Sequence, residues 1–282
     1  VDHHDIINYL NSTILTQEEP FGGVFVCGYN KLYENANDKG IKVLLDGNGV
    51  DEVFLGYMKY HQLYVQKSQS NNTLFSRTKD FENFWNVSVS DFTKFSSIDG
   101  TNGLCVSAIS KKLKKYNLIY NKNTEQLEDP VKDFAMNDLL FNKIPRGLRF
   151  NDKISMKHSC ELRVPYLDHR LVEFGYSIPT KYLINNYGTK SVFRQALSRY
   201  VPKEISHAKK RSVQSPQREW LASELSQIVN NILESKSFKD REWINVTEAK
   251  DKYEKYKKGN KENSFFIWQW INLELWARNF LD

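Results

Sequence analysis

The sequence predicts a helix-rich α/β fold, because two stretches of helical periodicity precede a short apolar run that ends in glycines. Apolar residues in 5–15 recur about 3.6 positions apart, which predicts a helix that ends at the turn 19–23. The same spacing in 24–37 predicts a second helix, capped by a glycine. Residues 41–45 form a compact apolar run, typical of a buried strand in a parallel sheet. Because the rest of the chain has mainly helical spacing, we expect clearly more helix than strand.

The composition favours a globular protein that acts on small molecules. The 282 residues contain 40% hydrophobic positions, enough for a sizeable core, and no apolar run reaches the roughly 20 residues of a membrane-spanning helix. The net charge is +6, but lysine and arginine are spread along the chain without a nucleic-acid-binding module. We therefore expect no membrane and no nucleic-acid partner. A phosphate-bearing small substrate accounts equally well for the positive charge.

Neither export nor cysteine chemistry is indicated by the sequence. Residues 1–23 lack the basic, apolar and small-residue regions of a secretory signal. Cys27, Cys105 and Cys160 stand far apart, without the paired spacing of a disulfide framework or a zinc site. We expect free thiols and a cytoplasmic protein.

The first candidate site is a polar loop at the end of the predicted strand. It comprises Asp46, Gly47, Asn48, Gly49, Asp51 and Glu52. In open α/β sheets ligands bind at the C-terminal ends of strands, and glycines let the backbone approach a ligand closely. Asp51 and Glu52 are hard oxygen donors that suit Mg²⁺ bound to pyrophosphate. The alternative is a tight turn whose two acids are solvated first-turn residues of the next helix, and the loop alone favours this alternative.

The second candidate is the stretch 155–169, which places charges of both signs in an apolar frame. A buried ion pair within this stretch, for example one involving Glu161, Arg163 or Asp168, would be architectural and costly to break. Contact with a ligand is an equally open interpretation, since perturbed charges gather at both kinds of site. His158 and His169 are expected to cap or pack instead of binding a metal, because their spacing matches no compact metal motif.

The third candidate is the cationic loop Lys209-Lys210-Arg211, which follows a predicted helix break. Lysine is a compact point charge that can neutralise a leaving pyrophosphate as its charge develops. Without further context, a solvated loop is the preferred interpretation. The charged run 110–115 is interpreted as a solvated helix face.

In this order, the three stretches resemble the synthetase domain of asparagine synthetases and related amidotransferases. Residues 44–57 resemble the family's strand and Ser-Gly-Glu-Gly-x-Asp-Glu loop. Residues 155–168 resemble its Ser-Met-x-x-Ser-x-Glu-x-Arg-Val-Pro-Phe-Leu-Asp segment. The proline spacing around the cationic loop aligns Lys210 with the family's essential lysine. The ending 268–276 is also typical, so the resemblance covers nearly the whole chain.

The resemblance implies part of an adenine-nucleotide-binding, parallel-sheet domain that is incomplete at its N-terminal side. Its α/β part would cover 1–60 and its mainly helical part 61–282. The implied cofactors are ATP and Mg²⁺. The implied reaction is attack of a small-molecule carboxylate on the α-phosphate of ATP, giving an acyl-adenylate and pyrophosphate. Ammonia or another amine then displaces AMP.

The resemblance also implies roles for single residues. Asp51 would be a catalytic contact to magnesium or pyrophosphate, with Glu52 supporting it. Lys210 would stabilise the leaving pyrophosphate. Glu161 and Arg163 would shape the substrate side.

The chain departs from the family pattern at several points. No run matches the Ser-Gly-Gly-x-Asp-Ser pyrophosphate loop, so a missing upstream segment or a partner chain is expected to supply it. No N-terminal nucleophilic cysteine is present for glutamine hydrolysis. Asn48 replaces a glutamate thought to accept a proton from the amine, and a neutral amide cannot be a general base. Ser212-Val213 replaces the usual Gly-Phe after the lysine.

Two hypotheses therefore remain. The chain is the catalytic part of an amide-forming ligase, or it is a non-catalytic relative that serves as a binding or scaffold subunit. The residues do not decide the oligomeric state, and a homodimer is compatible with both hypotheses.

Overall fold

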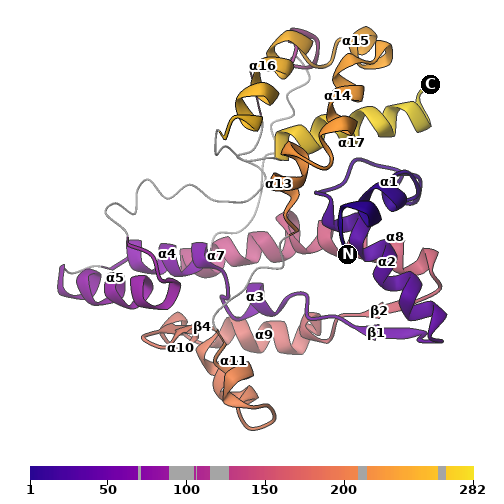
Figure 1. The fold of residues 1–282 in the computed structure, drawn as a ribbon. Coiled ribbons are helices and arrows are strands. Elements are labelled where there is room, and N and C mark those ends of the chain that lie inside the picture. Colours follow the sequence, from indigo (N-terminus) through magenta and orange to yellow (C-terminus); the bar gives the residue numbers. More distant parts are fainter. Residues whose placement is uncertain (69–70, 89–104, 106, 115–126, 209–214, 260–264) are drawn as a thin grey trace.

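Helices dominate the chain, which also contains two short pairs of strands (Figure 1). A computed structural model describes residues 1–68, 71–88, 105, 107–114, 127–208, 215–259 and 265–282. Within this part of the chain, the prediction of clearly more helix than strand is confirmed.

The two predicted N-terminal helices are present as α1 (His3–Gln17) and α2 (Phe25–Asp38). The start of α1 is fixed by a capping box: the Asp5 backbone N–H donates to Asp2 Oδ1 over 3.1 Å, and the Asp2 N–H donates to Asp5 Oδ2 over 2.9 Å. Both helices lie against α8 (Ile144–Lys157), and their buried faces form one side of the larger core.

The predicted strand is β1 (Val43–Leu45), which pairs in parallel with β2 (Glu161–Arg163). Leu44 lies opposite Leu162, and both pack on the larger core. The expectation that the strand is buried is wrong, because Val43 and Leu45 are exposed. Alternate side chains of a strand point to opposite faces, and within the described residues only one face of this sheet is covered.

A second strand pair is an antiparallel hairpin of β3 (Ile184–Asn185) and β4 (Gly188–Thr189). Gly188 has φ +102°, and a Cβ there would lie 2.0 Å from Phe84 Cε2. Only glycine permits this approach between the hairpin and the aromatic ring. The hairpin follows α10 (Thr180–Leu183) and leads into α11 (Ser191–Leu197).

The remaining elements are short to medium helices. Those before residue 210 are α3 (Val50–Val53), α4 (Met58–Gln66), α5 (Asn71–Trp85), α6 (Lys111–Lys114), α7 (Pro130–Asn137), the π-helical segment η3 (Asp138–Asn142), the 3-10 segment η4 (Pro165–Leu167), α9 (His169–Ser177) and α12 (Lys203–Ser206). The later ones are α13 (Gln217–Ala222), α14 (Ser226–Glu234), α15 (Lys236–Arg241), α16 (Val246–Lys257) and α17 (Phe265–Phe280). None of the residues of α6 is buried, which agrees with the predicted solvated helix face.

The apolar side chains form two cores. The larger joins α1, α2 and α8 to the C-terminal helices α13 to α17, and the smaller lies among α3, α4, α7 and α10. Trp268 and Asn272 of α17 both donate to the carbonyl of Phe21, at 3.0 and 2.9 Å. The C-terminal helix therefore fixes the turn between α1 and α2, nearly 250 residues earlier in the chain.

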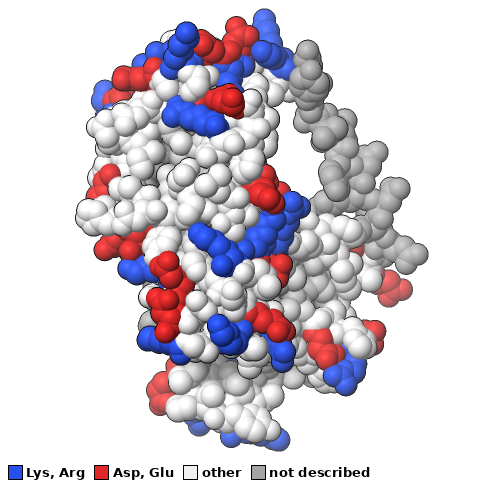
Figure 2. Space-filling model, turned by 90° about the vertical axis from the view of Figure 1, so that its right-hand side faces the viewer, with Lys and Arg blue, Asp and Glu red and all other residues white. Residues whose placement is uncertain are grey.

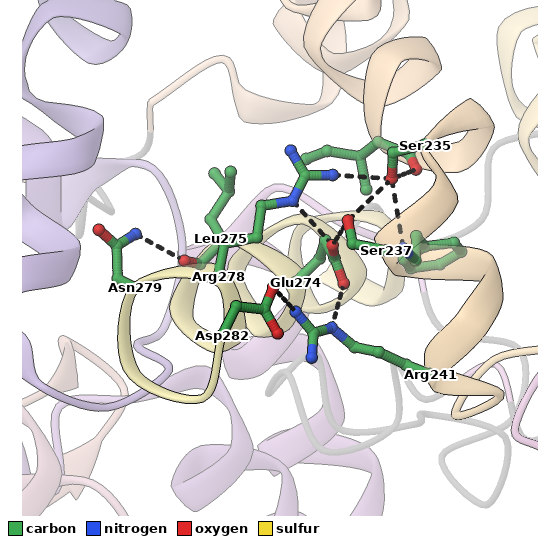
Figure 3. A network of polar contacts seen from close by, with 10 residues as sticks. Ser235, Ser237, Arg241, Glu274, Leu275, Arg278, Asn279 and Asp282 are labelled. Carbon is green, nitrogen blue, oxygen red and sulfur yellow. Dashed lines mark hydrogen bonds and ion pairs between the residues drawn. The ribbon is translucent and has the colours of Figure 1, made fainter.

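An ionic network holds the C-terminal helices together (Figure 3). The Glu274 carboxylate is buried and accepts from Arg241 Nε and Arg278 Nε, each at 2.8 Å. Ser237 Oγ also donates to it, and Arg241 Nη2 reaches the Asp282 carboxylate over 2.6 Å. Two cations thus neutralise one buried anion, the arrangement a buried charge requires.

The three cysteines are free thiols, as expected. Cys27 and Cys160 are buried, and Cys105 is partly exposed.

Charges of both signs are mixed on the surface. On the face drawn in Figure 2, lysine and arginine alternate with aspartate and glutamate instead of forming an area of one sign. Among the described helices, none has the length and apolar content to cross a bilayer.

Candidate functional site

The polar loop lies at the C-terminal edge of β1, as predicted. The Asp46 N–H donates to the Arg163 carbonyl over 2.8 Å and extends the pairing of β1 with β2. The Asp46 carboxylate then accepts from the Asn48 N–H and the Asn48 Nδ2, at 2.8 and 2.9 Å. The Asn48 side chain therefore closes a local turn over Asp46.

Glycine at position 49 brings the first two candidate stretches together. Gly49 has φ +95° and precedes α3, and a Cβ there would lie 2.2 Å from Leu167 Cδ2. The loop thus packs directly on the stretch 155–169. At Gly47, by contrast, a Cβ would meet nothing within 4 Å among the described residues, so the backbone there is open to a ligand.

Asp51 forms an ion pair with Lys190, a residue that the sequence analysis missed. Lys190 Nζ lies 2.7 Å from Asp51 Oδ1, and the two side chains are 14% and 13% exposed. Lys190 precedes α11 with a left-handed backbone, φ 56°. Because the partners are separated by 139 positions, no local spacing in the sequence indicates their contact. The alternative of a solvated Asp51 is wrong.

Glu52 points into the smaller core, so the solvated alternative is also wrong for this residue. It is 1% exposed, and burial raises the pKa of its carboxyl above 4.5, opposed by a hydrogen bond from Tyr57 and the charge of Lys143. Its Oε1 has no hydrogen-bond partner within the described residues. Lys143 also pairs with Asp138 at 3.1 Å, and Tyr60 donates to the same carboxylate over 2.8 Å. Asp51 and Glu52 therefore face different surroundings.

Glu161 and Arg163 are paired, but on the surface. Arg163 Nε lies 2.8 Å from Glu161 Oε1, and the side chains are 60% and 57% exposed, respectively. The expectation of a buried pair is wrong, because positions two apart in a strand point to the same face, here the face toward solvent. The hydrogen bond to Arg163 lowers the pKa of Glu161. A pair this exposed adds little stability.

The two histidines of the second stretch have no metal-binding environment. His158 follows α8, and its Nε2 is hydrogen-bonded to the buried Asn30 side chain, so it caps and packs as expected. His169 begins α9 and is exposed. Across the described residues, no three His, Cys, Asp or Glu side chains are grouped to share a metal ion.

The cationic loop with Lys210 lies outside the described residues, but the residues leading to it are tied to α11. Arg194 Nη1 donates to the carbonyls of Ser206 and Ala208, at 3.0 and 2.7 Å. Arg194 of α11 therefore holds the residues just before the cationic loop in place. The residue that precedes the same helix, Lys190, binds Asp51. Arg194 was not singled out from the sequence, since an arginine in a helical pattern carries no signal of its partners.

These features define a helix-rich α/β protein with a polar loop where parallel strands end, the usual ligand-binding edge of such sheets. The family model described as asparagine synthase matches residues 1–278. The chain belongs to the asparagine synthase family, which at family level is a family of carbon–nitrogen bond-forming ligases and amidotransferases.

Individual relatives agree with this family. "Asparagine synthetase [glutamine-hydrolyzing] 3" of Bacillus subtilis (strain 168) is 27% identical over 223 residues, which are 74% of this chain and 32% of that protein. "Asparagine synthetase [glutamine-hydrolyzing] 1" of the same organism is 30% identical over 131 residues, 44% of this chain and 20% of that protein. The Penicillium rubens protein "Amidase chyE" is 32% identical over 117 residues, 37% of this chain and 17% of that protein. The chain spans about a third or less of the length of these relatives.

Proposed function

We propose that this chain is the synthetase part of an ATP-dependent amide-forming ligase, which activates a carboxylate as an acyl-adenylate and then transfers ammonia or another amine. The observation that carries the proposal is the loop from Asp46 to Glu52. It lies at the C-terminal edge of β1, packs on the stretch 155–169 through Gly49, and presents Asp51 beside a lysine. This is where an α/β protein binds a nucleotide.

The residues of the loop fit magnesium and phosphate in their chemistry. Asp51 supplies the carboxylate oxygens that Mg²⁺ prefers, and its partner Lys190 supplies a cation that suits phosphate oxygens. The open backbone at Gly47 leaves room for a polyphosphate to approach. When bound, the metal would neutralise charge on the pyrophosphate. Asp46 is less available, because both of its carboxylate oxygens accept from Asn48.

The proposed roles of the chain's residues follow from this chemistry. Asp51 would hold the metal–pyrophosphate end of ATP while an oxygen of the substrate carboxylate attacks the α-phosphorus and the bond to pyrophosphate breaks. Lys210 would stabilise the charge that develops on the leaving pyrophosphate. Glu161 and Arg163, exposed on the edge strand β2, would contact the carboxylate substrate. Glu52 would support Asp51 from the core below.

The second step, transfer of the amine, needs a proton-accepting base that we do not assign to any residue of this chain. The amine attacks the acyl carbon, AMP leaves, and the amine must release a proton to a base. We propose that an upstream segment or a partner chain completes the site with a pyrophosphate-binding loop.

One observation favours a non-catalytic relative as the second candidate. The Asn48 amide is held in a turn by Asp46 and cannot accept a proton. A scaffold or binding subunit would tolerate this residue, whereas a ligase must find its base elsewhere.

The deciding experiment uses the longest natural polypeptide that contains this chain. ATP–pyrophosphate exchange is measured over a panel of carboxylates, with Asp51→Asn as the test variant and Asp240→Asn, an exposed aspartate of α15, as the control. Carboxylate-dependent exchange that falls on the order of a hundredfold in Asp51→Asn alone supports the ligase. No exchange with any carboxylate, or equal rates in both variants, contradicts it.

A further inference from the structure

A polar cleft lies between the end of α5 and α11, and none of the residues from Asp46 to Glu52 lines it. Its volume is about 450 Å³, and its walls include Asn83, Phe84, Asn186, Tyr187, Arg194 and Gln195. The walls come from the last turn of α5, the turn between β3 and β4, one side of α11, and His207 at the end of α12. Gly188, next to the turn between β3 and β4, packs directly against the Phe84 ring.

Arg194 places a buried cation at this cleft. The side chain is 8% exposed, and Nε and Nη1 donate to three neutral carbonyls: those of Thr189 at 2.8 Å, Ser206 at 3.0 Å and Ala208 at 2.7 Å. None of the hydrogen bonds within the described residues uses Nη2, and no described carboxylate pairs with this guanidinium. Burial lowers the pKa of Arg194, opposed by the charge of Asp51. A buried cation whose hydrogen bonds go to neutral carbonyls, with no carboxylate in direct contact among the described residues, attracts an anion.

The other walls suit an organic anion instead of a bare inorganic ion. Asn83, Asn186 and Gln195 contribute neutral amides that donate and accept hydrogen bonds. The Phe84 ring lies 5.7 Å from the Arg194 guanidinium and forms an apolar wall beside it. No aspartate or glutamate is among the described residues that line the cleft. Nε and both hydrogens of Nη1 are occupied by carbonyls, so Nη2 remains to donate to a carboxylate oxygen. The aromatic wall accepts an apolar body.

We propose that the cleft between α5 and α11 binds a small organic carboxylate, with the acid group at Arg194 and the organic body against Phe84. The site uses none of the residues of the loop from Asp46 to Glu52, so it does not depend on the proposed ligase activity. It is nevertheless joined to that loop through α11. Lys190, immediately before this helix, binds Asp51, and Arg194 lies one turn further along.

The test measures binding of 4-fluorobenzoate to the 282-residue chain by fluorine NMR. A ligand of about ten non-hydrogen atoms should bind saturably, with a Kd on the order of 1 mM. The neutral analogue 4-fluorobenzyl alcohol should bind at least about tenfold more weakly, because it cannot pair with the guanidinium.

The decisive variant is Gln195→Glu, because replacing Arg194 itself would also release three backbone carbonyls. A new carboxylate on the cleft wall should repel the ligand and lower its affinity about tenfold or more. Gln227→Glu, the same change at an exposed position of α14, should leave affinity unchanged, and circular dichroism should show both variants folded. Absence of saturable binding, equal affinity in the two variants, or equal binding of the alcohol would overturn the proposal.

Discussion

Lys190 Nζ lies 2.7 Å from Asp51 Oδ1, so the ion pair joins the cap of α11 to the first turn of α3. Both side chains are largely withdrawn from water, where an ion pair is much less screened than on the surface. The glycine at position 56 leaves room for the Asp51 carboxylate, because a Cβ there would lie 1.9 Å from Asp51 Oδ1. The pair couples the candidate nucleotide loop to α11, the helix that borders the cleft at Arg194.

Breaking this pair should cost stability as well as activity. Lys190→Met leaves a largely buried carboxylate without this cation and should lower the free energy of unfolding by about 2 kcal/mol. Lys236→Met, at an exposed position of α15, should change it by less than about 0.5 kcal/mol. A double-mutant cycle with Asp51→Asn, measured by urea denaturation, should give a coupling energy of about 1 kcal/mol or more. A coupling energy near zero would show that the contact contributes nothing.

The buried carboxyl of Glu52 should make stability depend on pH. Its pKa is raised above 4.5 by burial, so the folded state binds the proton more tightly than the unfolded chain. This contribution is fully present below pH 4.5 and is lost as the pH rises through the folded-state pKa. Glu52→Gln removes the titration, so the wild type should lose stability relative to this variant as the pH rises above 4.5. Urea denaturation of both proteins across this range measures the difference.

The matched control for this experiment is Glu204→Gln, an exposed glutamate in α12. Its stability should follow that of the wild type at every pH. If the difference in free energy of unfolding between the wild type and Glu52→Gln is also constant with pH, then Glu52 does not titrate in the folded protein over this range.

Replacing each of two glycines of the same loop by alanine should change stability to very different extents. Gly49→Ala puts a Cβ into Leu167 at a backbone angle that alanine avoids, so it should destabilise the fold by about 2 kcal/mol or more. Gly47→Ala meets open space and should change the free energy of unfolding by less than about 0.5 kcal/mol. Thermal and urea denaturation check both values. Similar losses at the two positions would contradict the packing of Gly49 on Leu167.

The network around Glu274 should be the most sensitive ionic site in the C-terminal helices. Glu274→Ala leaves Arg241 and Arg278 without their shared carboxylate and should lower the free energy of unfolding by about 3 to 5 kcal/mol. Glu234→Ala removes only an exposed pair with Lys250 at 3.8 Å, and its effect should stay below about 0.5 kcal/mol. Equal losses in urea denaturation would mean that the Glu274 network does not stabilise the fold.

The cationic loop provides a test of activity in the complete protein. Lys210→Ala should remove charge stabilisation worth roughly 3 kcal/mol, on the order of a hundredfold in turnover, while the melting temperature stays close to that of the wild type. Lys209→Ala should be much milder, because this position is not aligned with the family's lysine. Turnover and melting temperature are measured for both variants. Small, equal losses in turnover would mean that the loop is only a solvated charge run.

Local sequence patterns were sufficient for the elements whose structure depends on near neighbours. The helical spacing of 5–15 and 24–37 identified α1 and α2, and the apolar run 41–45 identified β1. The glycine-rich loop could likewise be located, because its position after a strand follows from chain order. These features arise from backbone periodicity and side-chain patterning within a few residues.

Contacts between distant segments could not be predicted in this way. Nothing near Asp51 indicates that Lys190 will meet it, and nothing near Arg194 indicates that carbonyls will be its partners. The sequence also did not show which charged side chains are buried. Glu52, shortly after β1, is buried, whereas Glu161, in β2, is exposed. Burial depends on which surfaces other parts of the chain cover. The burial and the ionic partners of the candidate site residues are therefore set by packing between segments more than 100 residues apart. Local periodicity carries no information about such packing.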